Sequence, residues 1–445
     1  MDLVLTADRI ITADGECSGW VAIADGRIAA LGDAESGAPP PSRERIDLRA
    51  DEVLLPGLVD THVHVNEPGR TEWEGFASAT AAAAAGGVTT LIDMPLNSIP
   101  PTVTAEALAV KRSAAAGQCH VDVGFWGGAV PGHEPDLAPL HADGVFGFKC
   151  FLLHSGVDEF APLSPEELPV HLARLAGLGA LMVVHAEDAD VIDAAPEPQG
   201  ASYAAFVESR PPQAETRAIE TVLRAARETG ARVHILHLSA ASALPILAAA
   251  RAEGLPVTVE TCPHYLSFAA EEIADGATAY KCCPPIRDDA NRDALWQGLV
   301  DGVIDIVVSD HSPSVLSLKC LDTGDLGAAW GGIASVQLGL SAIWTGARER
   351  GIPLARVVGW MATGPADLVG LGHKGRLEVG ADADLVVFAP EETQRVDAAA
   401  LRHRNPITPY DGQTLHGVVR STFLRGVPVL GDAPRGRLLS RTSNE

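Results

Sequence analysis

Eight short apolar runs rich in β-branched residues alternate with helix-like stretches through most of this chain. The runs lie at residues 58–63, 88–92, 121–125, 145–148, 181–184, 233–238, 257–260 and 304–308. The helix-like stretches between them include residues 74–85, 105–116, 165–178, 213–228, 242–253 and 289–299. Eight such repeats predict an α/β fold built as a (β/α)8 TIM barrel. A doubly wound parallel sheet remains the alternative, because periodicity does not report whether a sheet closes.

The two ends of the chain follow a different pattern. Residues 1–52 alternate apolar and polar positions between Asp-Gly turns, at Asp14-Gly15 and Asp25-Gly26, and the tail repeats this style over residues 383–388 and 417–430. We therefore expect one small β-sandwich built from both termini. The predicted boundaries are 1–56 for its N-terminal part, 57–366 for the barrel and 367–445 for its C-terminal part.

Composition narrows the class of partner. A chain of 445 residues with 47% hydrophobic content can bury one large core and a smaller one. The net charge of −25 argues against nucleic acid, whose phosphates need clustered Lys and Arg. The N-terminus lacks the basic segment of a signal peptide, so we expect a cytoplasmic protein without a membrane partner. Seven cysteines without a C-x-x-C motif indicate reduced thiols.

Candidate metal ligands stand at the ends of the predicted strands. His62 and His64 close the first strand, and side chains two apart on a strand point the same way, with Cα atoms about 6.6 Å apart. Four further residues close strands 4, 5, 6 and 8, namely Lys149, His185, His237 and Asp310. Active residues of such barrels lie on this rim. Four His and one Asp suit zinc or a similar divalent ion, with too few carboxylates for a calcium cage. By strand alternation, His234 should instead face the helix layer.

Lys149 is the exception in this set, because an ammonium group repels metal cations. It fits the cluster only if reaction with CO2 turns it into a carbamate, an anion that can bridge two ions. Two divalent ions, the carbamate, Asp310 and a hydroxide then sum to a net charge of about +1, which suits a hydroxide at neutral pH.

These motifs resemble the amidohydrolase superfamily, and within it the cyclic amidohydrolases: allantoinases, hydantoinases or dihydropyrimidinases, and dihydroorotases. The resemblance spans the chain through residues 56–64 (PGLVDTHVH), 84–90 (AAGGVTT), 147–149 (GFK), 284–287 (PPIR), 309–313 (SDHSP) and 375–385 (GRLEVGADADL). It implies a binuclear centre on His62, His64, Lys149, His185, His237 and Asp310, with Lys149 as N6-carboxylysine. Zinc is favoured, and Mn, Co or Fe remain open. It also implies a small-molecule substrate and a homotetramer.

The resemblance separates the three groups by their substrate contacts. Dihydroorotases bind a carboxylate with an Arg, an Asn and a His where this chain has Asn66, Leu96 and Ser314, so that group is disfavoured. Hydantoinases carry a Tyr shortly after the lysine, which is absent here, and they stay the alternative. Residues 66–76, 94–97, 147–151, 262–265 and 329–333 look like the allantoinase group.

An allantoinase-like chain is expected to hydrolyse the hydantoin ring of allantoin to allantoate. A hydroxide between the two ions would attack the ring amide carbonyl, and Asp310 would carry its proton to the departing nitrogen. The expected substrate contacts are Asn66, Cys283 and Gly332, and Cys283 replaces the usual Ser. Some members of this fold are silent assembly scaffolds that have lost ligands. Every ligand is present here, which favours an enzyme.

Overall fold

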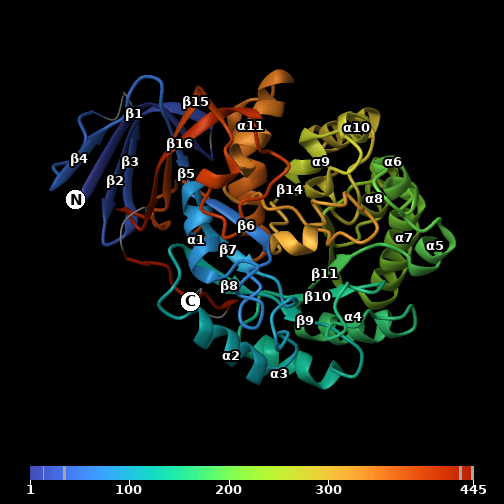
Figure 1. Ribbon diagram of the computed structural model, residues 1–445. Coiled ribbons are helices and arrows are strands. Elements are labelled where there is room, and N and C mark those ends of the chain that lie inside the picture. The colour runs from blue at the N-terminus through green and yellow to red at the C-terminus, as the bar shows by residue number, and fades with distance from the viewer. Residues whose placement is uncertain (14, 34–36, 430–432, 442–445) are drawn as a thin grey trace.

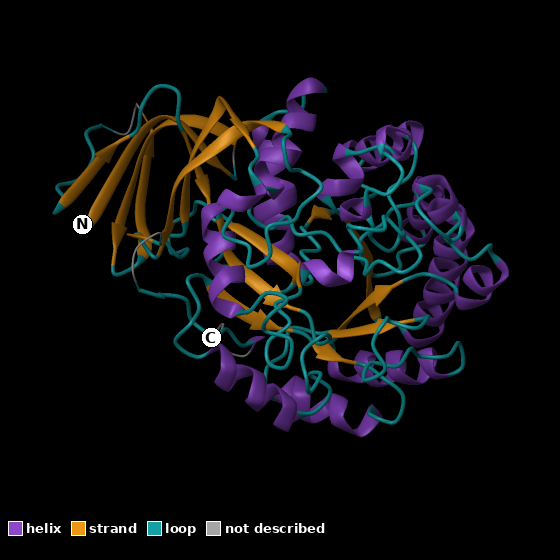
Figure 2. Cartoon of the chain, in the orientation of Figure 1, coloured by secondary structure: helices purple, strands orange, loops and turns teal. Residues whose placement is uncertain are grey.

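Two arcs of parallel strands surround the centre of the larger part of the molecule (Figures 1 and 2). The computed structural model describes residues 1–13, 15–33, 37–429 and 433–441. One arc has three strands, β6 (Leu58–Val63), β7 (Val88–Asp93) and β8 (Asp122–Phe125). The other has six, β9 (Gly127–Gly128), β10 (Phe148–Phe151), β11 (Leu181–His185), β12 (Arg232–Ile235), β13 (Val257–Thr261) and β14 (Ile306–Val307).

Backbone contacts join the two arcs at both gaps. Phe146 N donates to Phe125 O (3.0 Å), which links β8 to the start of β10. On the other side, Val63 and His311 form a parallel bridge, and His64 N donates to His311 O (2.8 Å). These contacts close the ring, as the predicted (β/α)8 barrel requires, so the doubly wound alternative is wrong.

The strand positions follow the apolar runs, with two shifts that matter for the site. The fourth run was predicted at residues 145–148, but β10 begins only at Phe148 because Phe146 bonds across to β8. Lys149 therefore lies inside its strand rather than after it. The sixth strand, β12, ends at Ile235, two residues before His237, whose φ of 35° breaks the strand geometry.

Helices cover the outer face of the ring (Figure 2). The six predicted segments correspond to α1 (Phe76–Ala85), α2 (Ala105–Ala115), α4 (Glu167–Leu178), α7 (Pro212–Thr229), α8 (Leu244–Ala252) and α10 (Asp289–Val300). In α7, for example, Ala218, Ile219, Val222 and Leu223 are buried at helical spacing. Further helices are α3 (Leu137–Ala142), α5 (Ala189–Ala194), α6 (Tyr203–Glu208), α9 (Pro263–Ser267), α11 (Gly339–Glu349), α12 (Leu354–Val358) and α13 (Gly364–Leu368).

Strands from both ends of the chain form one mixed sheet beside the barrel (Figure 1). Its order is β17-β16-β15-β5-β1-β2-β3, and β4 pairs with β1. The strands are β1 (Leu3–Thr12), β2 (Gly15–Ala24), β3 (Arg27–Asp33), β4 (Glu44–Asp47), β5 (Val53–Pro56), β15 (Leu385–Arg395), β16 (Thr414–Leu424) and β17 (Val427–Pro428).

The termini meet where β5 lies between β1 and β15. Leu385 pairs with Pro56, and the sheet folds over its own apolar core, which includes Leu5, Val21 and Phe423. The predicted Asp25-Gly26 turn joins β2 to β3 with positive φ at both residues, as a tight hairpin turn requires. The other predicted turn falls on Asp14, which lies outside the described residues. The domain boundaries at 56 and 366 stay predictions.

No helix in the described part of the chain is long and apolar enough to cross a membrane. Cys119, Cys150, Cys262 and Cys282 are buried and form no disulfide within the described residues.

A buried lysine ties the barrel to the terminal sheet. The ammonium of Lys374 lies 2.6 Å from Asp122 at the start of β8, 2.7 Å from Asp384 and 2.9 Å from Asp382. Lys374 is 1% exposed, and Asp122 and Asp384 are buried with it. The three carboxylates around it raise the pKa of Lys374 despite burial, so it stays charged at all ordinary pH values.

Replacing Lys374 with Met should destabilise the protein strongly, because Asp384 would remain buried without its ammonium partner and Asp122 would keep only the guanidinium of Arg425 as a cationic partner. Removing one member of a buried ion pair costs about 3–5 kcal/mol in free energy of unfolding. Urea unfolding of the purified variant measures this loss. The matched control is Arg227→Met, which removes an exposed pair with Glu253 and should change stability by less than about 1 kcal/mol. Equal losses in both variants would contradict the structural role of Lys374.

Candidate metal centre

The six predicted ligands converge at one end of the barrel. His62 lies in β6, Lys149 in β10 and His185 at the end of β11, while His64, His237 and Asp310 follow the ends of β6, β12 and β14. All six are buried. A cavity of about 380 Å³ opens above them, and its wall includes five of the six, namely His64, Lys149, His185, His237 and Asp310. This is the carboxyl end of the strands, where such barrels carry their active sites.

The side chains are close enough to share ions. His62 Nε2 lies 3.1 Å from Asp310 Oδ1, and His64 Nε2 lies 3.7 Å from the same oxygen. Lys149 Nζ is 3.4 Å from His62 Nε2. The ring of His237 lies 5.4 Å from that of His62 and 4.5 Å from that of His185. One cluster therefore contains every residue that the strand-end argument selected.

Two buried glutamates orient the imidazoles. His62 Nδ1 donates to Glu260 Oε1 (2.5 Å), and His185 Nε2 donates to Glu187 Oε2 (2.7 Å). Each bond fixes one ring nitrogen and leaves the other as an acceptor, which is how metal-binding histidines are commonly held. The sequence carried a signal for both glutamates that the strand-end argument did not use. Glu260 lies within an apolar strand, and Glu187 stands two residues after His185.

The prediction that His234 faces the helix layer is wrong. Its Nε2 donates to Glu260 Oε2 (2.9 Å), so it belongs to the polar interior beside His62. Alternation from His237 failed because β12 has already ended at Ile235 and His237 has left-handed backbone geometry. His234 therefore helps to hold the carboxylate that orients His62.

Burial sets the charge state of the cluster. It lowers the pKa of Lys149 to about 8, which makes an uncharged amine accessible near neutral pH. It raises the pKa of Asp310 to about 8 and holds the pKa values of His62, His64 and His237 well below their usual range. The imidazoles are thus neutral and have lone pairs to offer.

The donor set fits divalent metal ions. His62, His64 and Asp310 place one ligand atom each within 4.8 Å of one another. His237 Nδ1 is buried without a hydrogen-bond partner among the described residues, which is costly unless something binds there. Neutral imidazoles and a carboxylate are nitrogen and oxygen donors of the type that zinc and similar ions take.

The predicted substrate contacts divide between the cavity and its surroundings. Cys283 and Gly332 line the cavity. Asn66 does not; it is buried with φ of 66°, and its Nδ2 donates to Pro313 O (3.3 Å). Leu96 and Ser314 stand where dihydroorotases carry carboxylate-binding residues. Leu96 lines the cavity, whereas Ser314 is buried and does not contribute to the cavity wall.

Cationic side chains on the wall were not foreseen. Arg210 lines the cavity, and its guanidinium makes two bonds to Glu187 (3.0 and 2.6 Å). Lys281 donates to Ala329 O (2.6 Å) and Gly327 O (3.1 Å), and Lys319 donates to Trp330 O (3.1 Å) and Gly332 O. These lysines hold the loop at residues 327–332, which forms one side of the cavity. Such lysine-to-carbonyl contacts join distant segments and leave no local sequence pattern.

Comparison with known proteins agrees with this geometry. The model of the amidohydrolase family matches residues 53–429. The chain is 56% identical to an allantoinase of Streptomyces avermitilis over 99% of both chains. It is 49% identical to an allantoinase of Saccharomyces cerevisiae, over 85% of this chain and 83% of that one. With an allantoinase of Arabidopsis thaliana it shares 43% identity, over 96% and 88%.

Solved structures show the same architecture. An L-hydantoinase (dihydropyrimidinase) from Arthrobacter aurescens superposes with a TM-score of 0.91 at 30% identity and covers 99% of both chains. A dihydropyrimidinase from Brevibacillus agri superposes with a TM-score of 0.89 at 29% identity, over 99% of this chain and 98% of that one.

Proposed function

The chain belongs to the amidohydrolase family, and we propose that it is a cyclic amide hydrolase that opens the hydantoin ring of allantoin to give allantoate. The observation that carries this proposal is the cluster of four His, Lys149 and Asp310 beneath a cavity of about 380 Å³, in a chain whose relatives at 43–56% identity are allantoinases. A cavity of this size suits a small heterocycle.

We propose further that the cluster holds two divalent ions, with zinc favoured over Mn, Co or Fe. His62, His64, His185, His237 and Asp310 would be ligands, and Lys149 would bridge the ions after carboxylation by CO2. Support comes from the 3.4 Å between Lys149 Nζ and His62 Nε2 and from the partnerless Nδ1 of His237. Bound ions would supply Lewis-acid activation of water and of the amide carbonyl.

The residues of the chain divide the remaining work. Hydrolysis adds water across the amide: a C–O bond forms, the ring C–N bond breaks and one proton moves to the nitrogen. Asp310 can take the proton of the attacking water and return it to the departing nitrogen, because it is a carboxylate on the cavity wall beside the other proposed ligands. Glu260 and Glu187 keep His62 and His185 oriented throughout. Cys283 and Gly332 are the proposed substrate contacts, together with Asn66 in a supporting position.

Hydantoinase activity is the second candidate, favoured by the superposition on the hydantoinase from Arthrobacter aurescens. Allantoin is itself a hydantoin that carries a ureido group, so both candidate activities require a hydantoin ring to bind over the same cluster of proposed ligands. A homotetramer and a cytoplasmic location complete the proposal as inferences from the resemblance of this chain to the cyclic amidohydrolases.

Allantoin should be preferred over dihydroorotate by several powers of ten in kcat/KM. Leu96 offers no polar group to a carboxylate, and the wall cations Arg210 and Lys281 are already engaged by Glu187 and by backbone carbonyls. Each missing charge-assisted hydrogen bond costs about 1.5–3 kcal/mol. Ring-opening rates on allantoin, hydantoin, dihydrouracil and dihydroorotate measure the order. A kcat/KM for dihydroorotate equal to that for allantoin would refute the substrate assignment, and hydantoin ahead of allantoin would favour the second candidate.

A further inference from the structure

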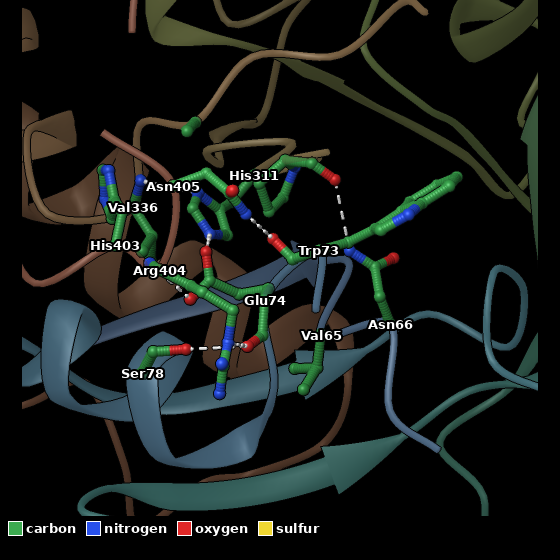
Figure 3. Close-up of polar contacts among 12 residues, drawn as sticks. Val65, Asn66, Trp73, Glu74, Ser78, His311, Val336, His403, Arg404 and Asn405 are labelled. Atoms are coloured by element: carbon green, nitrogen blue, oxygen red, sulfur yellow. Dashed lines mark hydrogen bonds and ion pairs between the residues drawn. The ribbon is translucent and has the colours of Figure 1, made fainter. Parts of the chain in front are cut away.

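His311 is a junction of segments that lie far apart in the chain (Figure 3). It directly follows Asp310 and is fully buried. Its Nδ1 accepts from the backbone N–H groups of Ser335 (3.1 Å) and Val336 (3.4 Å). Because Nδ1 accepts, Nε2 carries the proton, and it donates to Glu74 Oε2 (3.2 Å). These contacts fix the tautomer and the plane of the ring.

Glu74 is the second member of this junction. It is also fully buried, in the loop before α1, and its other carboxylate oxygen accepts from Arg404 N (3.1 Å). The guanidinium of Arg404 turns back to donate through Nε to the carbonyl oxygen of Glu74. Glu74 has no acid or base role in the proposed reaction. Its buried carboxylate instead holds His311 in place.

The third member comes from the terminal sheet. Residues 402–405, here called the strap, belong to the loop between β15 and β16. Asn405 Nδ2 donates to Trp73 O (2.8 Å) and Glu72 O (3.1 Å), and Arg402 N donates to Gln337 Oε1 (2.8 Å). The ring of His403 lies 4.8 Å from that of His311 (Figure 3). The strap is thus hydrogen-bonded to both segments that hold the His311 ring, the one before α1 at residues 72–74 and the one at residues 335–337.

This junction acts on a strained residue. Asp310 has a φ of 43°, a left-handed conformation that a residue other than Gly seldom adopts without support. The backbone of His311 is fixed as well, since its carbonyl accepts from His64 N (2.8 Å) and its N–H donates to Ser309 Oγ (3.1 Å). The fixed backbone and ring of His311, the next residue in the chain, therefore restrict where the Asp310 carboxylate points.

We propose that the Glu74–His311 pair, braced by the strap, is a positioning element that aims the Asp310 carboxylate at the reacting amide. Glu74 and His311 are positioning residues: neither lines the cavity nor belongs to the proposed ligands. The inference rests on the proposed function for the role of Asp310, and it assigns to the terminal sheet a part in the active site. Misplacement of a reacting group by about 1 Å can cost about a hundredfold in rate.

The test compares Glu74→Leu with Glu74→Gln in metal-loaded protein. Leu removes the acceptor for His311, so kcat on allantoin should fall about 10- to 100-fold with KM within about twofold of the parent and metal content unchanged. Gln keeps one acceptor oxygen and should recover most of the loss. The matched control is Asp122→Asn, which weakens the buried Lys374 cluster at the opposite end of β8; it should lower stability and leave kcat unchanged.

A second readout does not depend on the substrate. In metal-free protein, hydrogen exchange of the backbone amides at residues 309–312 should be faster in Glu74→Leu than in the parent or in Asp122→Asn. If the parent fails on allantoin but this pattern appears, the substrate assignment fails while the positioning element stands. A kcat for Glu74→Leu within about twofold of the parent, a loss that excess metal restores, or unchanged exchange at residues 309–312 would each overturn the inference.

Discussion

A Lys149→Ala variant is expected to lose several powers of ten in kcat/KM and to retain fewer metal ions than the two per chain expected of the parent. Lys149 Nζ lies 3.4 Å from His62 Nε2 and 4.9 Å from the centre of the Phe151 ring, so a carbamate on Lys149 would stand beside the proposed histidine ligands. Alanine would remove the proposed carbamate, which is one of the six proposed ligands. The measurements are elemental analysis of the purified protein and ring-opening rates on allantoin.

Chemical rescue separates loss of the bridge from general damage. Short carboxylic acids or added bicarbonate should restore part of the metal content and activity of Lys149→Ala, because they can occupy the place of the carbamate. The matched control is His185→Ala, which also removes a proposed ligand on the same rim but leaves an imidazole-shaped gap that a carboxylate does not fill. Arginine at position 149 does not form such a carbamate, so full activity in Lys149→Arg would show that carboxylation is not needed.

The barrel and the convergence of the six candidate ligands could be predicted because both depend on local patterns. Strands alternate with helices along the chain, and a ligand at the end of a parallel strand reaches the same rim whichever strand it follows. This argument does not need the distances between strands. Strand position alone is therefore enough to predict that His62, His185 and Asp310 cluster.

The argument failed where backbone geometry departs from regular strands. His234 faces Glu260 rather than the helices. Alternation counted back from His237 gave the wrong face because His237, with φ of 35°, is no longer part of β12. Asn66, with φ of 66°, turns away from the cavity for the same kind of reason. Left-handed conformations at residues other than Gly leave no mark in the apolar pattern, and they cluster near functional sites.

Contacts between distant segments were also beyond the sequence. Lys319 has no sequence signal that sets it apart from a surface lysine, yet it is 2% exposed and donates to backbone carbonyls of the cavity loop. Glu74 lies 237 residues from His311 and meets Arg404 across 330 residues. Only the folded chain shows that such charges are buried and paired. Residue type alone does not show whether a Glu or Lys is a buried positioning group or a solvated surface charge.

An Asp310→Asn variant should keep its fold and lose turnover. Asn preserves the size of the side chain but takes up no proton, so kcat on allantoin should fall about 10²- to 10⁴-fold, the usual contribution of a positioned acid or base. Stability should not suffer in metal-free protein. Burial raises the pKa of Asp310 from 3.8 to about 8, so the native carboxyl opposes folding increasingly as pH rises through that range, and Asn removes this penalty.

Three measurements distinguish this role from that of a passive ligand. Elemental analysis shows how many ions Asp310→Asn retains through the four His and Lys149, and kcat is compared at equal metal loading. Unfolding midpoints of the metal-free proteins at pH 7 should be equal or higher in the variant. Asp301→Asn, at the exposed end of α10, is the matched control and should match the parent in both respects. If metal-loaded Asp310→Asn turns over allantoin like the parent, the proton must travel by another group, and the raised pKa of Asp310 would then reflect burial alone.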